Sequence, residues 1–234
     1  MEIVGAEPPT VEQIQERHAR IRARLHAAAE ANGYDPERVN IVAVTKTWPI
    51  QLARAAFDAG LTMLGESRIQ EAEPKVAALP EAEWHFIGRL QSNKARRALR
   101  AFPVIHSVDS IDLLQRLDTL AVEEELTPRV LIQVNPRAEA AKAGMTPEAM
   151  MGTSLSGLTA LEVIGLMTIA PMGASAEEAR AAFARLRALR DRLQEATGIG
   201  LPELSMGMSA DAEAAAAEGA TLIRIGTALF GPRA

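Results

Sequence analysis

The stretch VNIVAVTKTWP, Val39 to Pro49, decides the fold because it reads as a buried strand that ends in a lysine. An apolar run, 41–44, comes just before Lys46, where a free ammonium group would be costly to remove from water. Lysine is rare in this chain and occurs only at positions 46, 75, 94 and 142, so most of the 25 basic residues are arginines. A partly buried lysine can lose its proton whereas an arginine cannot, so the stretch indicates a need for an amine at Lys46.

Seven further apolar runs follow this strand, and helix-like segments separate most of them. The strand candidates are 62–64, 84–88, 104–108, 130–134, 163–169, 204–208 and 222–225. The helix-like segments are 69–79, 93–102, 111–126, 147–155, 177–196 and 212–218. Strands that alternate with helices predict a parallel sheet. Eight of them in about 200 residues fit a closed (β/α)8 TIM barrel better than an open doubly wound sheet.

An additional helix is predicted before the first strand. Apolar residues recur at three- and four-residue steps from Val11 to Ala28, after Thr10, a residue typical of N-caps. We therefore predict a single α/β domain over residues 1–234, in which residues 1–35 form an N-terminal extension and helix. The loosest stretch, 136–145, is predicted to be a long loop after the fifth strand.

Composition and charge exclude several classes of site. The chain has no cysteine, which excludes disulfides, zinc–thiolate sites and a cysteine nucleophile. The net charge of -5 gives no reason to expect a nucleic-acid partner, and Arg96, Arg97 and Arg100 read as a solvated helix face. The first residues do not resemble a signal peptide, and no apolar stretch approaches the roughly 20 residues that span a bilayer. We expect a cytoplasmic protein without membrane contact.

Polar residues gather at or near the carboxyl ends of the predicted strands. In (β/α)8 barrels this is the end that carries the chemistry. In chain order the candidates are Lys46, Ser67, His85, Asn135, Met167, Thr168, Ser205, Ser209, Arg224, Gly226 and Thr227. The sequence therefore predicts a site at this end of the barrel.

Three interpretations of Lys46 remain open on spacing alone. The first is a lysine at the barrel rim that pairs with a carboxylate such as Glu66. The second is a Schiff-base lysine, whose amine becomes nucleophilic in apolar surroundings and attacks an aldehyde. The third is an electrostatic anchor for a phosphate or a carboxylate.

The segment LIRIGTALFG, residues 222–231, indicates a phosphate-binding site. Gly226 can expose backbone N–H groups without a Cβ in the way, and Thr227 adds a hydroxyl donor. Ser209 is either a second phosphate ligand or the N-cap of a helix over 210–218. A lysine that reacts with aldehydes beside phosphate-binding amides fits pyridoxal 5'-phosphate.

Eight motifs in the same order resemble the YggS/PROSC family of pyridoxal-phosphate homeostasis proteins. They are AVTKTWP, GESRIQEAEPK, WHFIGRLQSNK, HSVDS, VLIQVN, GLMTIAP, LSMGMSAD and RIGTALFG, between residues 39 and 231. The resemblance implies an alanine racemase N-terminal-domain-like barrel without that enzyme's C-terminal domain. It also implies a non-catalytic protein of vitamin B6 homeostasis that stores, buffers or delivers the cofactor, with transient contacts to apo-enzymes. A monomer is expected, since no second domain completes a shared site.

The resemblance assigns a role to several of the candidate residues. Lys46 matches the lysine that holds pyridoxal phosphate covalently as a Schiff base, and Ser209, Gly226 and Thr227 match the phosphate-binding segments. Arg224 matches the arginine that faces the pyridine nitrogen. A guanidinium cannot accept a proton, so it keeps this nitrogen unprotonated and makes the ring a poorer electron sink. Without the resemblance, Arg224 reads as a rim arginine paired with a carboxylate.

Ser67, His85 and Met167 complete the predicted cofactor-binding set. Ser67 stands where the family usually has Asn, so a contact of that Asn is in doubt here. His85 could also serve as a base, although the residues favour a histidine hydrogen-bonded inside the barrel, and a metal site with His106 is not expected. Met167 is read as barrel packing more than as a specific sulfur contact.

The alternative function is a small pyridoxal-phosphate-dependent amino-acid racemase. A two-base racemase needs a second acid–base group on the cofactor face opposite the lysine. In alanine-racemase-like enzymes this group is a tyrosine of the C-terminal domain, which is expected to be absent here. The single tyrosine, Tyr34, follows the first helix and is expected on the rim opposite the site. We therefore favour a carrier with no catalytic residue and no metal.

Overall fold

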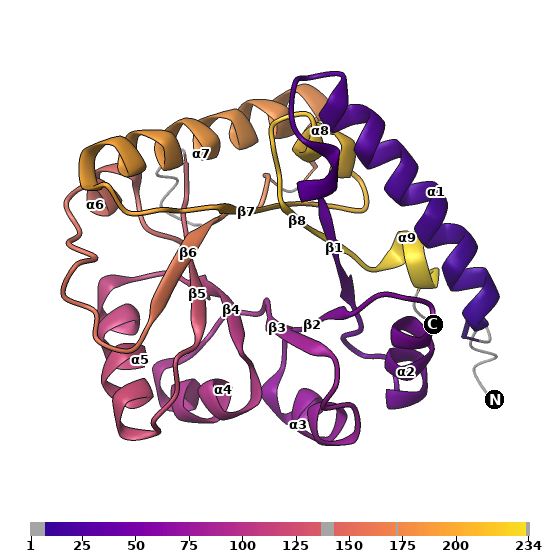
Figure 1. Cartoon of the computed structure of the whole chain (residues 1–234), viewed down its shortest axis with the longest axis horizontal. Helices are drawn as coiled ribbons and strands as arrows, with labels where there is room; N and C mark the ends of the chain where they lie inside the picture. The colour runs from indigo at the N-terminus through magenta and orange to yellow at the C-terminus, as the bar shows by residue number, and fades with distance from the viewer. Residues whose placement is uncertain (1–7, 137–142, 172, 233–234) are drawn as a thin grey trace.

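The computed structural model describes residues 8–136, 143–171 and 173–232. Within these residues, eight parallel strands close into a barrel in chain order (Figure 1). The strands are β1 Asn40–Val44, β2 Met63–Glu66, β3 Glu83–Phe86, β4 Val104–Val108, β5 Arg129–Gln133, β6 Glu162–Met167, β7 Glu203–Met208 and β8 Leu222–Ile225. The predicted (β/α)8 barrel is therefore confirmed.

Helices follow the strands and surround the barrel. They are α2 Ile50–Asp58, α3 Ile69–Ala78, α4 Ala95–Ala101, α5 Ile111–Glu123, α6 Pro147–Met151, α7 Ala176–Thr197, α8 Ala212–Ala216 and α9 Thr227–Phe230, with 3-10 turns η1 Pro36–Arg38 and η2 Ser92–Lys94. The four residues of α9 are too short to show a helical period, and this helix was not predicted. Of the loop predicted over 136–145, residues 137–142 lie outside the described residues.

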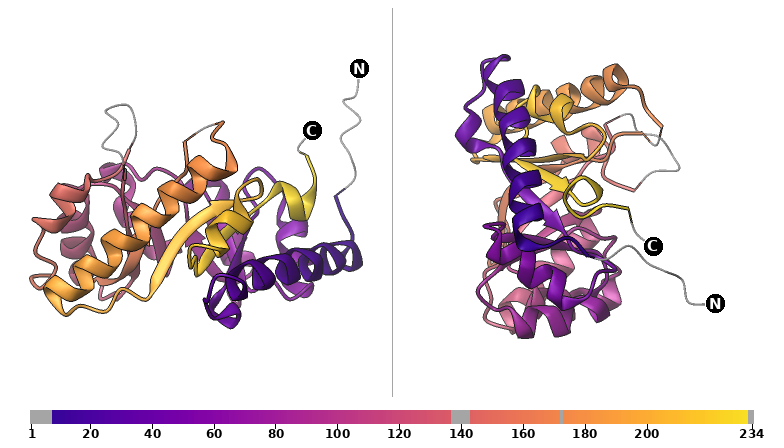
Figure 2. Two further views of the ribbon diagram at one scale, coloured as in Figure 1. Left: turned by 90° about the horizontal axis from the view of Figure 1, so that it is seen from above. Right: turned by 90° about the vertical axis from the view of Figure 1, so that its right-hand side faces the viewer.

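The additional helix, α1 Val11–Glu30, begins with a capping box. Thr10 Oγ1 accepts a hydrogen bond from Gln13 N, and the Gln13 side chain accepts one from Thr10 N. The helix lies beside α8 and α9 (Figures 1 and 2). Arg17 Nη1 donates to the carbonyl oxygen of Leu229 at 2.8 Å, and Arg24 pairs with Glu213. The predicted helix thus holds the segment that follows β8.

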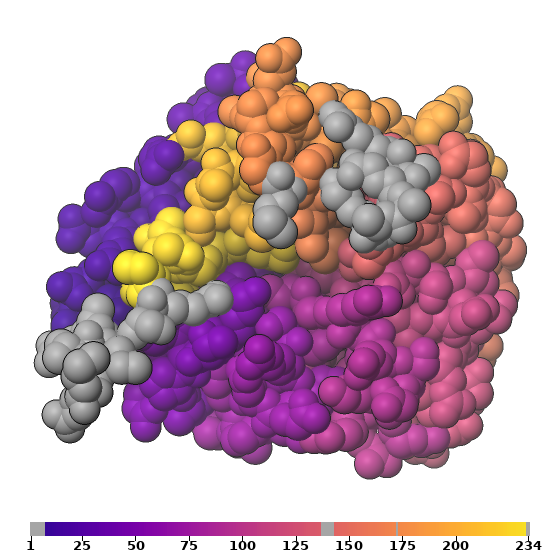
Figure 3. All heavy atoms as spheres, turned by 180° about the vertical axis from the view of Figure 1, so that it is seen from behind, coloured from indigo at the N-terminus to yellow at the C-terminus, as the bar shows by residue number. Residues whose placement is uncertain are grey.

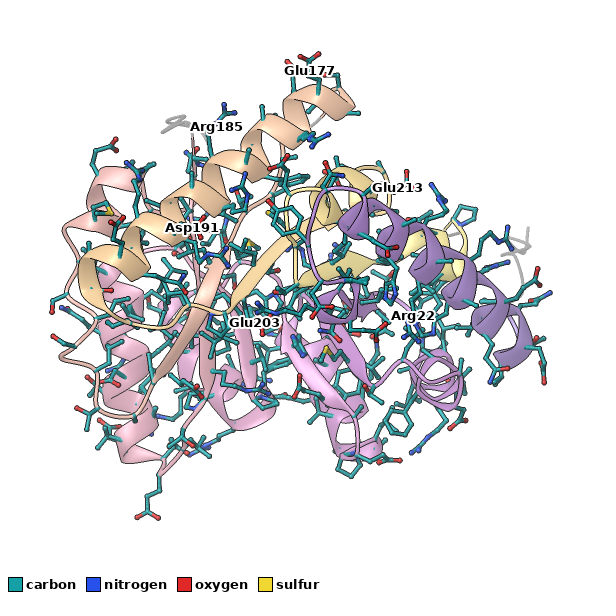
Figure 4. The ribbon with its side chains drawn as sticks, turned by 45° about the horizontal axis from the view of Figure 1, so that its top comes forward. Arg22, Glu177, Arg185, Asp191, Glu203 and Glu213 are labelled. Atoms are coloured by element: carbon teal, nitrogen blue, oxygen red, sulfur yellow. The ribbon has the colours of Figure 1, made fainter. Side chains whose placement is uncertain are left out.

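Helix α7 shows how the amphipathic helices cover the barrel. Its inner face is buried and carries Ala179, Ala182, Phe183, Leu186, Leu189 and Leu193. Glu177, Arg185 and Asp191 are exposed on its outer side (Figure 4). The separation of apolar and charged residues at helical spacing fixes the face that packs on the strands.

The inside of the barrel, called the bore here, is lined largely by aliphatic side chains. Its apolar cluster consists of Val42, Val104, Leu131, Ile164, Met167 and Leu222. Alternate residues of a strand point to the same side. Since Leu222 lies in the bore, Arg224, two residues further along β8, also faces the bore.

The arginines of α4 are neutralised by carboxylates of the neighbouring helices. The ion pairs are Arg96 with Glu123 and Glu124, Arg97 with Glu73, and Arg100 with Glu124. The interpretation of these arginines as a solvated helix face is confirmed. Among the described residues, none of the helices combines the length and the hydropathy that a membrane-spanning segment requires.

Candidate cofactor site

Lys46 and the Gly226–Thr227 turn follow two adjacent strands. β1 pairs with β8 in parallel, and Ala43 lies opposite Ile225. A Cβ added to Gly226 would lie 3.4 Å from Val44 Cβ. Because parallel neighbours are about 4.8 Å apart, the segment that carries Lys46 and the Gly226–Thr227 segment lie side by side at the same end of the barrel. Figure 3 shows this face, where the yellow β8–α9 segment borders the purple segments around a hollow.

The backbone directly after the half-buried Lys46 is strained. Thr47 has a φ of 68°, which a β-branched residue rarely adopts. The carbonyl oxygen of Thr45 accepts a hydrogen bond from Trp48 N at 3.1 Å, which closes the turn around Thr47. Such conformations cost about 1–3 kcal/mol, persist only where the surroundings hold them, and cluster at ligand sites.

A buried ion pair beneath this turn was missed by the sequence analysis. Lys75 of α3 donates to Glu66 Oε1 at 2.6 Å and to the carbonyl oxygen of Thr45 at 2.9 Å. Thr45 Oγ1 donates to the same carboxylate oxygen at 2.8 Å. The side chains of Lys75 and Glu66 are 7% and 0% exposed. The carboxylate that had been considered for Lys46 therefore pairs with Lys75, and the pair holds the residue before Lys46.

Arg224 lies buried in the bore, with 4% of its surface exposed. Its Nη1 donates to Ser205 Oγ, and its Nη2 donates to the carbonyl oxygen of Thr168 at 3.0 Å. Burial lowers the pKa of Arg224 to about 10, so the guanidinium is still charged at neutral pH. Its hydrogen bonds go to a hydroxyl and a carbonyl, so the interpretation as a rim arginine paired with a carboxylate is wrong.

Ser209 does not cap the helix that follows it. Helix α8 begins at Ala212, at the start of the predicted segment 212–218, and its N-cap is Asp211, two residues after Ser209. Ser209 Oγ instead accepts a hydrogen bond from Ala228 N at 3.3 Å, which joins the ends of β7 and β8. Ser209 and Thr227 are both exposed, so their hydroxyl groups are accessible to a ligand.

His85 and Met167 lie within strands, deeper than Lys46. His85 Nδ1 lies 2.7 Å from His106 Nε2, and His85 Nε2 lies 2.7 Å from Glu83 Oε1. The interpretation of His85 as a histidine hydrogen-bonded inside the barrel is therefore confirmed. Met167 belongs to the apolar cluster of the bore, which confirms its packing role. Direct contacts of these two side chains with a cofactor stay predictions.

The turn after β2 packs closely on the turn after β3. A Cβ added to Gly88 would lie 2.2 Å from the carbonyl oxygen of Ser67, so this position requires glycine. Ser67 itself is half-buried. Its predicted contact with a cofactor stays a prediction.

Tyr34 lies at the opposite end of the barrel from Lys46. A Cβ added to Gly219, which precedes β8, would lie 2.8 Å from the Tyr34 ring. The guanidinium of Arg187 lies over this ring, 5.9 Å from its centroid. The expected position of Tyr34 on the opposite rim is confirmed.

Glu83, at the start of β3, is expected to make the protein sensitive to acid. Its hydrogen bond with His85, then the one from Arg129, lowers the pKa of Glu83 from 4.5 to about 2. A depressed folded-state pKa means that the carboxylate stabilises the fold above about pH 4.5 and that this contribution is lost as pH falls towards about 2. Urea unfolding should show that Glu83→Gln is less stable at pH 7 and loses less stability across this range. An acid slope equal to that of the wild type would contradict this assignment.

The chain is therefore a (β/α)8 barrel protein with a lysine after its first strand and a buried arginine on its last strand. The family model "Alanine racemase, N-terminal domain" matches residues 14–234. The chain is 44% identical to a pyridoxal phosphate homeostasis protein of Synechocystis sp. over 85% of this chain and 93% of that protein. It is also 44% identical to a pyridoxal phosphate homeostasis protein of Pseudomonas aeruginosa, over 94% of this chain and 96% of that protein. The chain therefore belongs to the family of pyridoxal phosphate homeostasis proteins.

Solved structures agree with this assignment. PipY of Synechococcus elongatus, solved without and with pyridoxal phosphate (PLP), matches with TM-scores of 0.85 and 0.83 at 43% and 42% identity. Each match covers 93% of this chain and 100% of that chain. An alanine racemase of Clostridium difficile matches with a TM-score of 0.70 at 16% identity, which shows the fold alone.

Proposed function

We propose that this chain binds pyridoxal 5'-phosphate at the mouth of the barrel, as a Schiff base on Lys46. It stores, buffers or delivers the cofactor in vitamin B6 homeostasis, as a single-domain monomer that contacts apo-enzymes transiently. The observation that carries the proposal is the pairing of β1 with β8, which puts Lys46 beside the Gly226–Thr227 turn. The PLP-bound structure of PipY, 42% identical to this chain, supports it.

The residues at the mouth fit the chemistry of this cofactor. Lys46 supplies an amine for the aldehyde. Ser209, Gly226 and Thr227 supply hydroxyl and main-chain donors for the phosphate. Arg224 supplies a donor that cannot take up a proton from the pyridine nitrogen. When bound, PLP supplies an electrophilic carbonyl carbon and an electron sink.

Two features favour a carrier over a racemase. Arg224 keeps its proton at neutral pH, so a ring nitrogen that faces it stays neutral and withdraws electrons weakly. Tyr34, the one tyrosine of the sequence, packs beside Gly219 at the far end of the barrel. A tyrosine of this chain therefore does not reach the face of a ligand held by Lys46.

Borohydride reduction followed by peptide mass spectrometry tests the attachment. Reduction fixes the bond between the cofactor and the amine, so one pyridoxyl group is expected on Lys46. The other lysines, at positions 75, 94 and 142, serve as internal controls within the same sample. Equal labelling of all four would show an adventitious adduct and would contradict the proposal.

Exchange of the α-proton of alanine in deuterated water separates the carrier from the racemase. The carrier is expected to exchange this proton far more slowly than about 10 s⁻¹, the median turnover of enzymes. Exchange near that rate by the PLP-loaded protein, and not by Lys46→Ala, would favour the racemase.

Arg224→Glu is expected to shift the visible spectrum of the bound cofactor. A carboxyl group at this position can share a proton with the pyridine nitrogen, whereas the guanidinium cannot. Arg224→Gln is the matched control, because a neutral amide keeps a donor and leaves the nitrogen unprotonated. The measurement is the absorption spectrum of each loaded variant. Spectra of the Glu and Gln variants that both equal the wild-type spectrum would place the pyridine ring elsewhere.

A further inference from the structure

A chain of buried side chains crosses the bore from Glu83 to Arg224. His85 contacts Glu83 Oε1 and His106 Nε2, each at 2.7 Å. His106 Nδ1 lies 2.8 Å from Ser205 Oγ, which accepts a hydrogen bond from Arg224. The exposed fractions are 2% for His85, 0% for His106, 0% for Ser205 and 4% for Arg224. The chain thus runs through β3, β4, β7 and β8. It connects the end of the barrel where the strands begin with the proposed cofactor site.

The two ends of this chain limit the directions that its hydrogen bonds can take. A carboxylate only accepts, so His85 donates to Glu83 from Nε2, and when that is its single ring proton its Nδ1 accepts. His106 then donates from Nε2 and accepts at Nδ1 from the hydroxyl of Ser205. The guanidinium of Arg224 only donates, so it gives its proton to the remaining lone pair of Ser205. In this arrangement every donor points from Arg224 towards Glu83.

The state of His106 agrees with this direction. Complete burial, together with the charge of Arg224, lowers the pKa of His106 well below its usual value. A neutral His106 has one donor and one acceptor, and the chain uses both. Bonds that run in one direction polarise one another in a low-dielectric interior, so the charge of Glu83 is felt at Ser205.

Ser205 is the adjustable contact of Arg224. The other acceptor, the carbonyl oxygen of Thr168, is fixed because Thr168 Oγ1 donates to Val134 O and Thr168 N donates to Ser205 O. The Ser205 hydroxyl contacts His106 Nδ1 and Arg224 Nη1, and of these two only His106 can accept its proton. Loss of the hydroxyl's orientation would leave the guanidinium held at one edge and free to turn about it.

A purely structural role explains this chain poorly. The surrounding bore is aliphatic, and apolar side chains of similar volume are often neutral or stabilising replacements for buried polar groups. A fully connected polar path that leads to one guanidinium points to control of that group.

We propose that His85, His106 and Ser205 form a positioning relay, which links Arg224 to the carboxylate of Glu83 and fixes the plane in which the guanidinium meets the cofactor ring. The inference rests on the proposed function, since it places the pyridine nitrogen at Arg224. These three residues act through Arg224 and need not touch the ligand.

The test is the ¹⁵N chemical shift of the ring nitrogen in protein loaded with ¹⁵N-labelled PLP. Ser205→Ala is expected to move this resonance away from its wild-type position, while borohydride reduction of a parallel sample still places the pyridoxyl group on Lys46. Ser205→Thr keeps a hydroxyl and should restore the wild-type value. Ser107→Ala is the matched control. Ser107 is buried beside His106, and its Oγ has no hydrogen-bond partner among the described residues, so no shift is expected.

Two results would overturn the relay. The first is a Ser205→Ala protein that carries the pyridoxyl group on Lys46 and still shows the wild-type ¹⁵N resonance. This result would leave the proposed function intact. The second is a wild-type protein in which borohydride reduction leaves no pyridoxyl group on Lys46. This result would contradict the proposed function and the relay together. Should Ser205→Ala not fold, Glu83→Gln provides the same test. It removes the charge at the end of the chain opposite Arg224. It is expected to move the resonance in the same direction by a smaller amount, and no movement would reject the relay.

Discussion

Lys46→Ala is expected to abolish the visible absorption band that the protein acquires with PLP. The loss should be complete, because the band depends on a covalent bond between the cofactor and this amine. The absorption spectrum after incubation with PLP and gel filtration measures it. Lys94→Ala is the control and should keep the band, since Lys94 lies in the η2 turn before α4.

Lys46→Arg separates two interpretations of this lysine. An electrostatic anchor for a phosphate would tolerate arginine, which carries the same charge and binds phosphate well. A Schiff-base lysine would not, because a guanidinium does not give up its proton and does not condense with an aldehyde. We expect Lys46→Arg to be colourless. A yellow Lys46→Arg protein, or a wild type that stays colourless with PLP, would contradict the covalent role.

The barrel was predictable because local signals repeat along the chain. The run that ends at Val44 and the run from Leu222 to Ile225 coincide with β1 and β8. Adjacent strands in a (β/α)8 barrel put their carboxyl ends on one rim, so the closeness of Lys46 and Gly226 followed from chain order. This part of the site required only the fold and the strand ends.

The contacts inside the barrel were not predictable in the same way. His106 and Ser205 lie 99 residues apart, and nothing in either segment identifies the other. The register of β4 against β5 also shifts between Ile105 and Val108, which interrupts the alternation that would assign each residue to a face. The bore chain therefore needed the packed structure.

The buried ion pair of Lys75 with Glu66 was only partly predictable from the sequence. The scarcity of lysine had drawn attention to Lys46, and it applied equally to Lys75. What the sequence lacked was the direction of Lys75 on α3, which turns its amine under β1 towards Glu66. Because Pro74 lies within this helix, the local pattern gave little support to a buried inner face at the next residue.

Lys75→Met is expected to lower the free energy of unfolding by about 3–5 kcal/mol, the usual cost of removing one partner from a buried ion pair. The variant leaves the Glu66 carboxylate fully buried, and its Oε2 already has no hydrogen-bond partner among the described residues. Urea unfolding at pH 7 measures the loss. A loss below about 1 kcal/mol, the range of exposed pairs, would contradict the buried pair.

The double variant Lys75→Met, Glu66→Leu separates the stability of the pair from its effect on the site. It removes both charges, so it should regain more than half of the lost stability, less the cost of the Thr45 hydroxyl left without its acceptor. The carbonyl oxygen of Thr45 still loses its bond from Lys75, and the strained Thr47 next to Lys46 is held less firmly. We therefore expect PLP affinity to stay reduced after stability returns. Recovery of both would mean that the pair supports the fold without ordering the lysine.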